Sequence, residues 1–507
     1  MKERFSENFI KEKMEIKEER LKKIIEILGQ KPILKWAKDL KKEFPEAKVY
    51  LVGGIVRDQL LGRKSDDLDF VIGQVPAKKL HKFLTKRGKV ELVGTTFGVR
   101  KFIPSGVKLK KGKALDLALP RTEISTGPGY REFEIAYDHK LPIKEDLSRR
   151  DFTVNAMAQD LETGELIDPF DGKKDLEKKL IRTVREPKDR FSEDYSRILR
   201  ALRFSCQLGF DIEEKTWQAI CKYAPKILEK KLFGKRERTI VPWETVGKEF
   251  LKTLEAYPEK CLDLYDRSGI LKIVLPEVED LKGVEQPPEF HEEGDVYVHT
   301  RLVLSNIKKD ASLSLKLAAL LHDIGKPATL KTPERDGTDR IRFDGHDKVG
   351  AKMAEKICRR LRLPKHLTDD VVWLIAKHML FVSANVEEMR KGTIKKYFID
   401  DLKRGDDLLD LYQTESLSSF GPYHQEGLRK YENTVKYIES VRKSFKEAKV
   451  ETFKDIIDGN VIMTEFSIKP GPKVGELLAK ANDFITGYIS QHKKKPTKEE
   501  VLEYLKR

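Results

Sequence analysis

The chain contains little cysteine and no long apolar run. Only four of its 507 residues are cysteines, Cys206, Cys221, Cys261 and Cys358, and they have neither the spacing of metal ligands nor the density of a disulfide framework. No apolar run approaches the ~20 residues that a membrane-spanning helix needs, and the charged first residues do not resemble a signal peptide. We therefore expect reduced cysteines in the core, no membrane partner and a cytoplasmic protein.

Internal repeats, low-complexity segments and an acidic excess are also missing. Lys and Arg total 100 against 84 Asp and Glu, which gives a formal charge of +16. A basic balance favours a polyanionic partner, and nucleic acid comes well before an anionic membrane surface. At 507 residues the chain is long enough for several domains with sizeable cores.

Hydrophobic patterning predicts an α+β protein. Strand-like runs alternate with helical pieces in the pattern of a small N-terminal α/β head. These runs are 49–52, 69–72, 90–93 and 114–118, with a helix at 77–86. Beyond Leu176 the strand pattern stops, and helical periodicity predicts an all-helical neck, body and tail.

Five segments are expected on this basis. They are a helical extension at 1–45, the α/β head at 46–160, a helical neck and body at 161–285, a separate helical domain at 286–445 and a helical tail at 446–507. The use of the first segment and the oligomeric state are left open by the sequence.

The most informative stretch is Val49-Tyr-Leu-Val-Gly-Gly-Ile-Val-Arg-Asp58. An apolar run that ends in two glycines is typical of a buried strand, and the following residues open a short helix whose free N–H groups can face an anion. Gly53 and Gly54 would let a triphosphate approach the backbone. Taken alone, a Gly-Gly pair is usually only a tight turn.

Aspartates follow on the next strand, in Asp66-Asp67-Leu-Asp69. Because side chains alternate along a strand, Asp67 and Asp69 point the same way with their Cα atoms about 7 Å apart. Two such carboxylates repel unless a cation lies between them, and oxygen ligands beside phosphates favour Mg²⁺. Asp116, on a probable neighbouring strand, could face them and either assist the metal or bind substrate. We therefore predict nucleotidyl transfer, with Asp67, Asp69 and Asp116 as catalytic residues.

A first arginine-rich motif, Ser148-Arg-Arg-Asp-Phe-Thr-Val-Asn155, extends this prediction. It places Arg149 and Arg150 close to the amide of Asn155, and guanidinium forks suit phosphate oxygens. A surface ion-pair cluster is the alternative when this motif is considered alone.

A second motif, Glu193-Asp194-Tyr-Ser-Arg197, leads into further arginines. Asp194 and Arg197 are three residues apart and would share a helix face, which an ordinary salt bridge would also explain. Arg197, Arg200 and Arg203 form a crowd of like charge that we expect a triphosphate to neutralise. An acceptor at Asp194 and a donor at Arg197 match the amino group and ring nitrogen that cytosine and adenine share, so the helix could select C and A without a template.

Together these motifs resemble the class II tRNA nucleotidyltransferases, which comprise the CCA-adding enzymes and their bacterial poly(A) polymerase relatives. The resemblance runs from about residue 46 to 205 and includes Asp168-Pro-Phe-Asp-Gly172. It implies Mg²⁺ as cofactor, CTP and ATP as nucleotides and the acceptor arm of tRNA as partner.

The resemblance also implies roles for individual residues. Asp67 and Asp69 would hold the metal, and Asp194 and Arg197 would read the base. The residues implied at the nucleotide are Gly53, Gly54, Arg57, Arg149, Arg150, Asn155, Asp194, Arg197, Arg200 and Arg203.

Two further segments bear on the resemblance. The loop from Pro120 to Arg131 is similar to a mobile segment that such enzymes use in the last, adenosine step. A Glu-Arg pair that commonly opens a later neck helix is replaced by Trp243-Glu244-Thr245, which puts arginine support for the base-reading helix in doubt.

A second site is predicted around His322-Asp323, at the end of an apolar helix. Imidazoles with carboxylates can bind Mn, Ni, Fe or Zn. The stretch from about 290 to 415 resembles the HD phosphohydrolase superfamily, which some bacterial tRNA nucleotidyltransferases carry, and implies His299, His322, Asp323 and Asp406 as ligands. His346 and His378 lie nearby in the sequence.

The sequence does not determine the number of additions; the frequency of the activity in the family it resembles favours complete CCA addition, and three alternatives remain. They are an enzyme that adds only CC or only A, a poly(A) polymerase, and an RNA phosphohydrolase of the HD type with an inert head.

Overall fold

The structure is a computed structural model that describes residues 32–65, 68–93, 99–109, 113–125, 127, 133–233, 236–381, 385–449, 453 and 456–507. The chain forms two compact units, each described here by itself. The first runs to Glu249 and includes Arg267–Gly269, and the second comprises Phe250–Asp266 and Ile270–Arg507.

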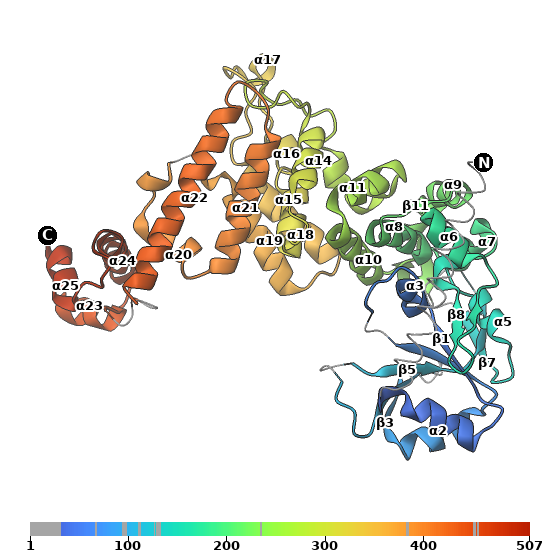
Figure 1. Ribbon diagram of the computed structural model, residues 1–507. Helices are drawn as coiled ribbons and strands as arrows, with labels where there is room; N and C mark the ends of the chain where they lie inside the picture. Colours follow the sequence, from blue (N-terminus) through green and yellow to red (C-terminus); the bar gives the residue numbers. More distant parts are fainter. Residues whose placement is uncertain are drawn as a thin grey trace, which may run out of the picture. The chain divides into compact units, whose positions relative to one another are not determined.

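A mixed seven-stranded sheet organises the first unit (Figure 1). Its strands, in spatial order, are β3 Gly88–Val93, β4 Val99–Pro104, β5 Leu115–Ala118, β2 Asp69–Gly73, β1 Lys48–Val52, β8 Ala158–Asp160 and β9 Leu166–Ile167. Within the described part of this sheet, β2 and β5 pair in parallel and the other neighbouring strands are antiparallel. Val52, Val71, Leu147 and Ala158 belong to one buried cluster, which fixes the ends of β1 and β2 where the predicted motifs lie.

The helices of the first unit connect these strands and follow them along the chain. They are α2 Lys35–Glu43, α3 Gly54–Leu60, α4 Ala77–Thr85, α5 Ile143–Ser148, α6 Gly172–Lys178, α7 Pro187–Glu193, α8 Ser196–Leu208 and α9 Glu214–Tyr223, with short 3₁₀ turns at Pro32–Leu34, Thr153–Asn155 and Ala224–Leu228. The boundary between the two units falls inside α10, Trp243–Ala256.

The second unit is helical throughout its described residues. It contains α11 Pro258–Arg267, α12 Ile270–Val274, α13 Pro276–Glu279, α14 Val296–Asn306, α15 Leu313–Leu321, α16 Lys326–Thr329, α17 Pro333–Asp336, α18 His346–Arg360, α19 Lys365–Lys377, α20 Lys391–Phe398, α21 Leu402–Ser418, α22 His424–Glu447, α23 Gly459–Glu465, α24 Pro472–His492 and α25 Lys498–Lys506, with 3₁₀ turns at His378–Phe381 and Val386–Glu388. The α15 helix is mostly apolar and buried, and it ends at Leu321, directly before His322, so that burial of this helix carries the His-Asp pair inside.

The fold class is confirmed, since an α/β head precedes a helical body. The four strands predicted in the head are all present, whereas β4, β8, β9 and the strands Arg121–Ser125 and Phe133–Tyr137 were not predicted. One detail is wrong: strands do not stop at Leu176, because short strands pair further on. These are β10 Leu180–Ile181 with β11 Asp211–Ile212, and β12 Lys230–Phe233 with β13 Arg236–Thr239. The five segment boundaries remain predictions.

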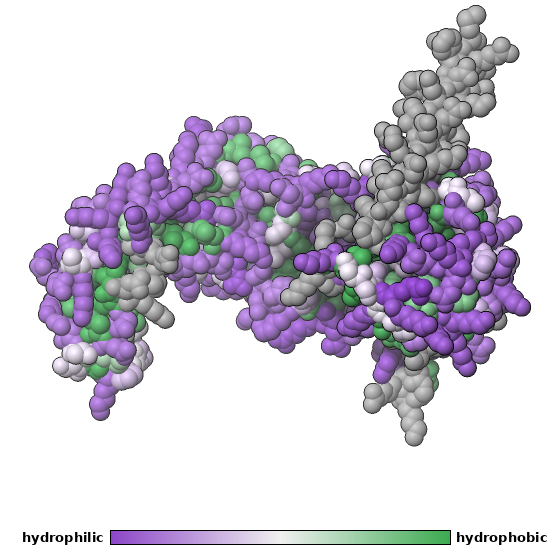
Figure 2. Space-filling model, turned by 60° about the horizontal axis from the view of Figure 1, so that its bottom comes forward, coloured by the Kyte–Doolittle hydropathy of each residue, from purple (hydrophilic) through white to green (hydrophobic). Residues whose placement is uncertain are grey.

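The surface is strongly polar. Hydrophilic side chains dominate the face seen in Figure 2, with apolar patches between them. Among the described helices, none has the length and apolar composition that crossing a membrane requires.

Candidate active sites

The Gly-Gly turn joins β1 to α3, as predicted. Gly53 has φ of 76°, a left-handed conformation that favours glycine. A Cβ atom at this position would lie 2.8 Å from Nη1 of Arg150, so the guanidinium packs directly against the turn. The backbone conformation therefore favours glycine, and a larger residue would also require the end of the Arg150 side chain to shift.

The aspartates gather at the end of β2. Asp69 opens the strand and pairs in register with Asp116 of β5, so the third carboxylate lies beside Asp69 as the sequence predicts. Asp67 lies outside the described residues. Burial lowers the pKa of Arg150, and the negative charges of Asp146 and Asp69 oppose that shift. Gly53, Arg150, Asp69 and Asp116 are thus parts of one site.

Arg149 and Arg150 are held by acidic neighbours. The Nε atom of Arg149 donates to Asp146 at 3.0 Å, and its Nη1 donates to Glu123 at 2.7 Å. Arg150 reaches Asp146 over 3.4 Å. Asp146 is fully buried and therefore orients both guanidinium groups, while Arg150 keeps only a long contact with it.

A chain of buried polar groups connects Arg57 with the neck. Arg57 Nη1 donates to Asn155 Oδ1 at 2.7 Å, and Asn155 Nδ2 donates to Asp151 at 3.3 Å. Asp151 forms an ion pair of 2.5 Å with Arg200. Burial alone would raise the pKa of Asp151, but the charge and hydrogen bonds of Arg200 prevail and lower it to about 2. The residues predicted from two separate motifs are therefore coupled through Asp151, which the sequence did not single out.

The arginines of α8 are neutralised by the protein, which corrects one expectation. Arg197 pairs with Glu193 at 2.6 Å, and Arg203 pairs with Glu249 at 3.1 Å, while Arg200 binds Asp151. The guanidinium groups of Arg200 and Arg203, together with that of Arg57, also gather around one aromatic ring. Arg57, Arg200 and Arg203 lie 5.4, 5.4 and 4.4 Å from the centroid of Phe204. The crowd of like charge thus does not require a triphosphate to be stable.

Asp194 does not lie on the helix that carries Arg197. The α8 helix begins at Ser196, and Asp194 precedes it in extended conformation, where one carboxylate oxygen accepts the backbone N–H of Ser196 at 2.8 Å. Both Asp194 and Arg197 are buried. Burial raises the pKa of Asp194, while its hydrogen bonds with Ser196 and the positive charge of Arg197 oppose this. The pair is thus adjacent, although its members do not share a helix face.

The segment Trp243-Glu244-Thr245, which replaces the Glu-Arg pair of the family, lies at the start of α10. The same helix supplies Glu249 to Arg203, so α8 receives a carboxylate partner from α10. The loop after Pro120 forms β6 Arg121–Ser125 and β7 Phe133–Tyr137, a two-stranded sheet whose tip lies outside the described residues.

In the second unit, one carboxylate joins two histidines. Glu415 contacts Nε2 of His299 at 3.2 Å through one oxygen and Nε2 of His322 at 2.7 Å through the other. His322 Nε2 also lies 3.0 Å from Asp323. His322 Nε2, Asp323 Oδ2 and Glu415 Oε1 are buried, and none has an aligned hydrogen bond within the described protein. Short distances without alignment fit a shared cation better than a hydrogen-bond network.

The orientation of the imidazoles supports this interpretation. His322, His346 and His378 each direct Nδ1 to a backbone carbonyl, at 2.8, 2.8 and 2.7 Å. Donation from Nδ1 leaves Nε2 as the ligand atom, the arrangement usual for metal-binding histidines. Asp323 lies 3.5 Å from His346 Nε2, so it is shared between His322 and the pair of His346 and His378.

The pKa values reflect the same electrostatics. Burial alone would lower the pKa of His322, but the charges of Asp323 and Glu415 raise it to about 10. Burial and the positive charges of His322 and His346 lower the pKa of His378 to about 4. The cluster therefore attracts a cation at His322, and three groups of residues here could hold a metal ion: His291 with Glu293 and His299, His299 with His322 and Asp323, and Asp323 with His346 and His378.

Asp406 does not belong to this cluster, contrary to prediction. Its side chain is 59% exposed and pairs with Arg442 at 2.7 Å. Asp406 and Glu415 lie on the same helix, α21, nine residues apart, which corresponds to about 13 Å along its axis. Glu415, and not Asp406, contacts His299 and His322. His299, His322 and Asp323 come together as predicted.

A pocket of about 900 Å³ opens beside the cluster. Asp323, His346, His378 and Glu415 line its inner part, so these groups are accessible to a ligand. Lys326 also lines it, and its Nζ contacts Asp323 at 2.7 Å.

Comparison with known proteins gives consistent results. A family model described as the poly A polymerase head domain matches residues 49–182, and one described as the HD domain matches residues 296–406. The multifunctional CCA protein of Legionella pneumophila (strain Paris) is 36% identical over 358 residues, which cover 69% of this chain and 78% of that protein. The multifunctional CCA protein of Herminiimonas arsenicoxydans is 32% identical over 379 residues, with 74% and 83% covered.

Two solved structures share the fold. The Bacillus stearothermophilus CCA-adding enzyme in complex with CTP has a TM-score of 0.63 at 22% identity, covering 94% of this chain and 98% of that one. The Thermotoga maritima CCA-adding enzyme complexed with tRNA has a TM-score of 0.52 at 21% identity, and 92% of each chain is covered.

Proposed function

This chain belongs to the family of the multifunctional CCA proteins, and we propose that it builds and repairs the CCA end of tRNA by adding C and A from CTP and ATP. The observation that carries the proposal is the assembly of Gly53, Arg150, Asp69 and Asp116 at one end of the head sheet, in a chain with relatives at 36% identity. The reaction takes place in the cytoplasm.

Asp67, Asp69 and Asp116 are the proposed ligands and catalytic carboxylates. Asp69 and Asp116 are register partners, and an all-oxygen set beside a phosphate site suits Mg²⁺. Bound there, Mg²⁺ would supply positive charge to the reacting phosphate and to the attacking oxygen. These carboxylates would position the metal and the RNA 3′ hydroxyl, and Arg150, packed against the Gly53 turn, would contact the triphosphate.

The nucleotide is held by cationic groups whose orientation is fixed in advance. Arg57 and Arg150 lie against the turn, and Asn155 holds Arg57 in place. Arg149 is oriented by Asp146 and Glu123. Arg200 and Arg203 lie alongside on α8, anchored by Asp151 and Glu249. Because these side chains are already paired, they offer rigid donors and lose little conformational entropy when the triphosphate binds.

Base selection is assigned to Asp194 and Arg197. Both side chains are buried, so a base that failed to pair with their remaining hydrogen-bonding atoms would cost free energy of about 1–3 kcal/mol. Cytosine and adenine satisfy an acceptor next to a donor, whereas uracil and guanine present a carbonyl to the carboxylate.

The proposed RNA partner is the tRNA acceptor arm. The net charge of +16 favours contacts with phosphates, so affinity should fall with salt at a log–log slope of about −0.7 to −0.9 for each phosphate contacted. A complex that is insensitive to salt would contradict this mode of binding.

The test uses three tRNA transcripts, one lacking CCA, one ending in CC and one complete. Each is incubated with Mg²⁺ and CTP, ATP or both, with Asp69→Asn as the inactive control. Complete CCA on the first transcript, with no further extension, is the expected result. Addition of only CC or only A would identify a specialised enzyme, and long A tails would identify a poly(A) polymerase.

A second activity is favoured by the unaligned, buried atoms of His322, Asp323 and Glu415. We propose that His299, His322, Asp323 and Glu415 hold a divalent metal, with His346 and His378 adjacent, and that the site hydrolyses phosphate esters. The donor set of imidazoles and carboxylates suits Mn, Ni, Fe or Zn. Hydrolysis of bis(p-nitrophenyl) phosphate with added Mn²⁺ tests it: Glu415→Gln should abolish turnover, and Asp406→Asn should not. Equal loss in both variants would refute the assignment of Glu415.

A further inference from the structure

An aromatic surface lies at the pocket of the His/Asp cluster and is not needed for metal binding. Phe290 and Tyr423 stack with ring centroids 5.4 Å apart and an interplanar angle of 27°. Both line the pocket, and they remain 39% and 52% exposed. Arg340 lies over the Phe290 ring, 5.3 Å from its centroid. We call Phe290 and Tyr423 the aromatic platform.

The platform is built on two loops that are tied together. Glu292 N–H donates to the carbonyl of Phe420, and Phe420 N–H donates to the carboxylate of Glu293, both at 2.9 Å. At Gly421, a Cβ atom would lie 2.8 Å from the carbonyl oxygen of Glu289. The loops are therefore too close to admit a side chain at this position, and the two rings are held in a fixed geometry.

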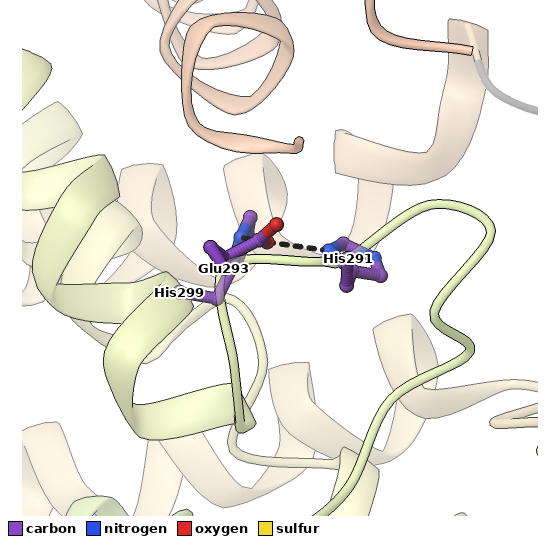
Figure 3. Close-up of side chains that lie close together, drawn as sticks. All are labelled: His291, Glu293 and His299. Carbon is purple, nitrogen blue, oxygen red and sulfur yellow. Dashed lines mark hydrogen bonds and ion pairs between the residues drawn. The ribbon is translucent and has the colours of Figure 1, made fainter. Parts of the chain in front are cut away.

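Glu293 also connects the platform to the cluster. Its Oε1 atom lies 2.7 Å from Nδ1 of His291 and 2.7 Å from Nδ1 of His299. Figure 3 shows these three side chains close together, near the start of α14. The other oxygen holds Phe420. Since His299 contacts Glu415 through Nε2, one carboxylate fixes both the platform loop and a proposed metal ligand.

Basic groups complete the pocket. Lys326, Arg340 and Lys348 line it, and no described carboxylate forms an ion pair with Arg340 or Lys348. Arg342, by contrast, is committed to Asp339 through two hydrogen bonds. The pocket thus combines exposed rings with available cations and with the metal-binding cluster.

We propose that the aromatic platform stacks on the unpaired base of a nucleotide, whose phosphate ester is held by the basic groups and directed to the His/Asp cluster. A purely apolar ligand would not use Arg340 and Lys348, and a phosphate without a base would not use the rings. A paired base has no free face for stacking. The inference rests on the hydrolase function proposed above only for the chemistry that follows binding.

Binding of AMP and of ribose 5-phosphate to the full chain with Mn²⁺, measured by calorimetry, tests the platform. The two probes differ only in the base. Tyr423→Ala should weaken AMP binding at the pocket about tenfold and leave ribose 5-phosphate unchanged, while Tyr423→Phe keeps the ring and should behave as wild type. Nucleotide binding by the head is common to all three proteins, so any difference among them reports on the pocket.

Identical AMP binding isotherms for wild type, Tyr423→Ala and Tyr423→Phe would overturn the proposal. Phe290→Ala provides a second truncation from the other loop and should give the same selective loss. Both platform rings are partly exposed, so a loss confined to AMP cannot come from general unfolding, which would weaken both probes.

Hydrolysis separates this inference from the activity on which it builds. Bis(p-nitrophenyl) phosphate has no nucleobase, so comparing its turnover in wild type and in Glu415→Gln tests the metal cluster apart from nucleotide binding. Absent turnover in wild type, together with platform-dependent AMP binding, would remove the hydrolase and keep the nucleotide site. Turnover in wild type, together with AMP binding that is unchanged in Tyr423→Ala, would keep the hydrolase and remove the nucleotide site.

The nucleotide can be free or at the end of an RNA strand. A short single-stranded RNA with a 3′-phosphate and the same RNA paired to its complement distinguish these sources. Tyr423-dependent binding of the single strand, tighter than that of AMP, would identify an RNA end as the ligand. Binding of AMP alone would identify a free nucleotide.

Discussion

Replacement of Asp151 by Asn tests how the nucleotide site is held together. The carboxyl group is buried and pairs with Arg200 at 2.5 Å. Its pKa is lowered from the ordinary 3.8 to about 2, which corresponds, at ~1.36 kcal/mol per pKa unit, to roughly 2.4 kcal/mol of stabilisation at neutral pH. Asp151→Asn should therefore lower the free energy of unfolding of the first unit by about 2 kcal/mol.

Tryptophan fluorescence during urea unfolding provides the assay. Three of the four tryptophans, Trp36, Trp217 and Trp243, belong to the first unit, and Trp373 belongs to the second. A Trp373→Phe background therefore reports only on the first unit.

A double-mutant cycle isolates the ion pair. Arg200→Met and the double variant Asp151→Asn with Arg200→Met complete it, and a coupling energy of about 2 kcal/mol is expected. Because the folded pKa of Asp151 is lowered, its stabilisation is complete above the ordinary value and disappears only as pH falls from 3.8 towards 2. The penalty of Asp151→Asn should thus be constant between about pH 5 and 8, and a coupling energy below about 0.5 kcal/mol would refute the reasoning.

Three further outcomes are expected. Gly53→Ala should reduce kcat/KM for CTP by at least about tenfold, because a left-handed φ costs a side chain ~1–2 kcal/mol and the Cβ atom would meet Arg150 at 2.8 Å; wild-type kinetics would show that the turn can move. In metal titrations, Glu415→Gln should weaken Mn²⁺ binding at least about tenfold and the exposed Asp406→Asn should not change it; the reverse order would restore the ligand set implied by the sequence. EDTA should lower the thermal unfolding temperature of the second unit in wild type, and an unchanged temperature would argue against a bound metal there.

The sequence motifs of the head site could be predicted, but the ion pairs that connect them could be predicted less well. A glycine pair after an apolar run and a carboxylate on each of two strands are local patterns, and Gly53, Asp69 and Asp116 lie as those patterns indicate. The carboxylates that pair with the arginines are distant in the sequence. Asp151 and Glu249 lie 49 and 46 residues from the arginines that they hold. Counting like charges along the helix therefore predicted that an external anion is needed, whereas the folded chain supplies the negative charge itself.

The strands that were missed have a similar explanation. In β4, Val-Arg-Lys-Phe-Ile-Pro, buried and half-buried residues alternate, but Arg100 occupies a buried position and hides the period. Burial lowers the pKa of Arg100, in keeping with a guanidinium turned inwards. In β12, Leu232 is 70% exposed, so this apolar residue of the short hairpin strand does not contribute to a buried face.

The wrong choice of Asp406 was avoidable from the sequence. The α21 helix carries several acids, and the preceding histidines do not tell which of them faces the core. At 100° per residue, Leu408 and Glu415 lie within about 20° of each other, whereas Asp406 is turned about 160° away. Leu408 and Leu411 are fully buried, so the apolar stripe itself identifies Glu415 as the acid that points inwards. For a buried metal site, the phase of an acid relative to the apolar face of its helix is therefore a stronger criterion than whether it is aspartate or glutamate.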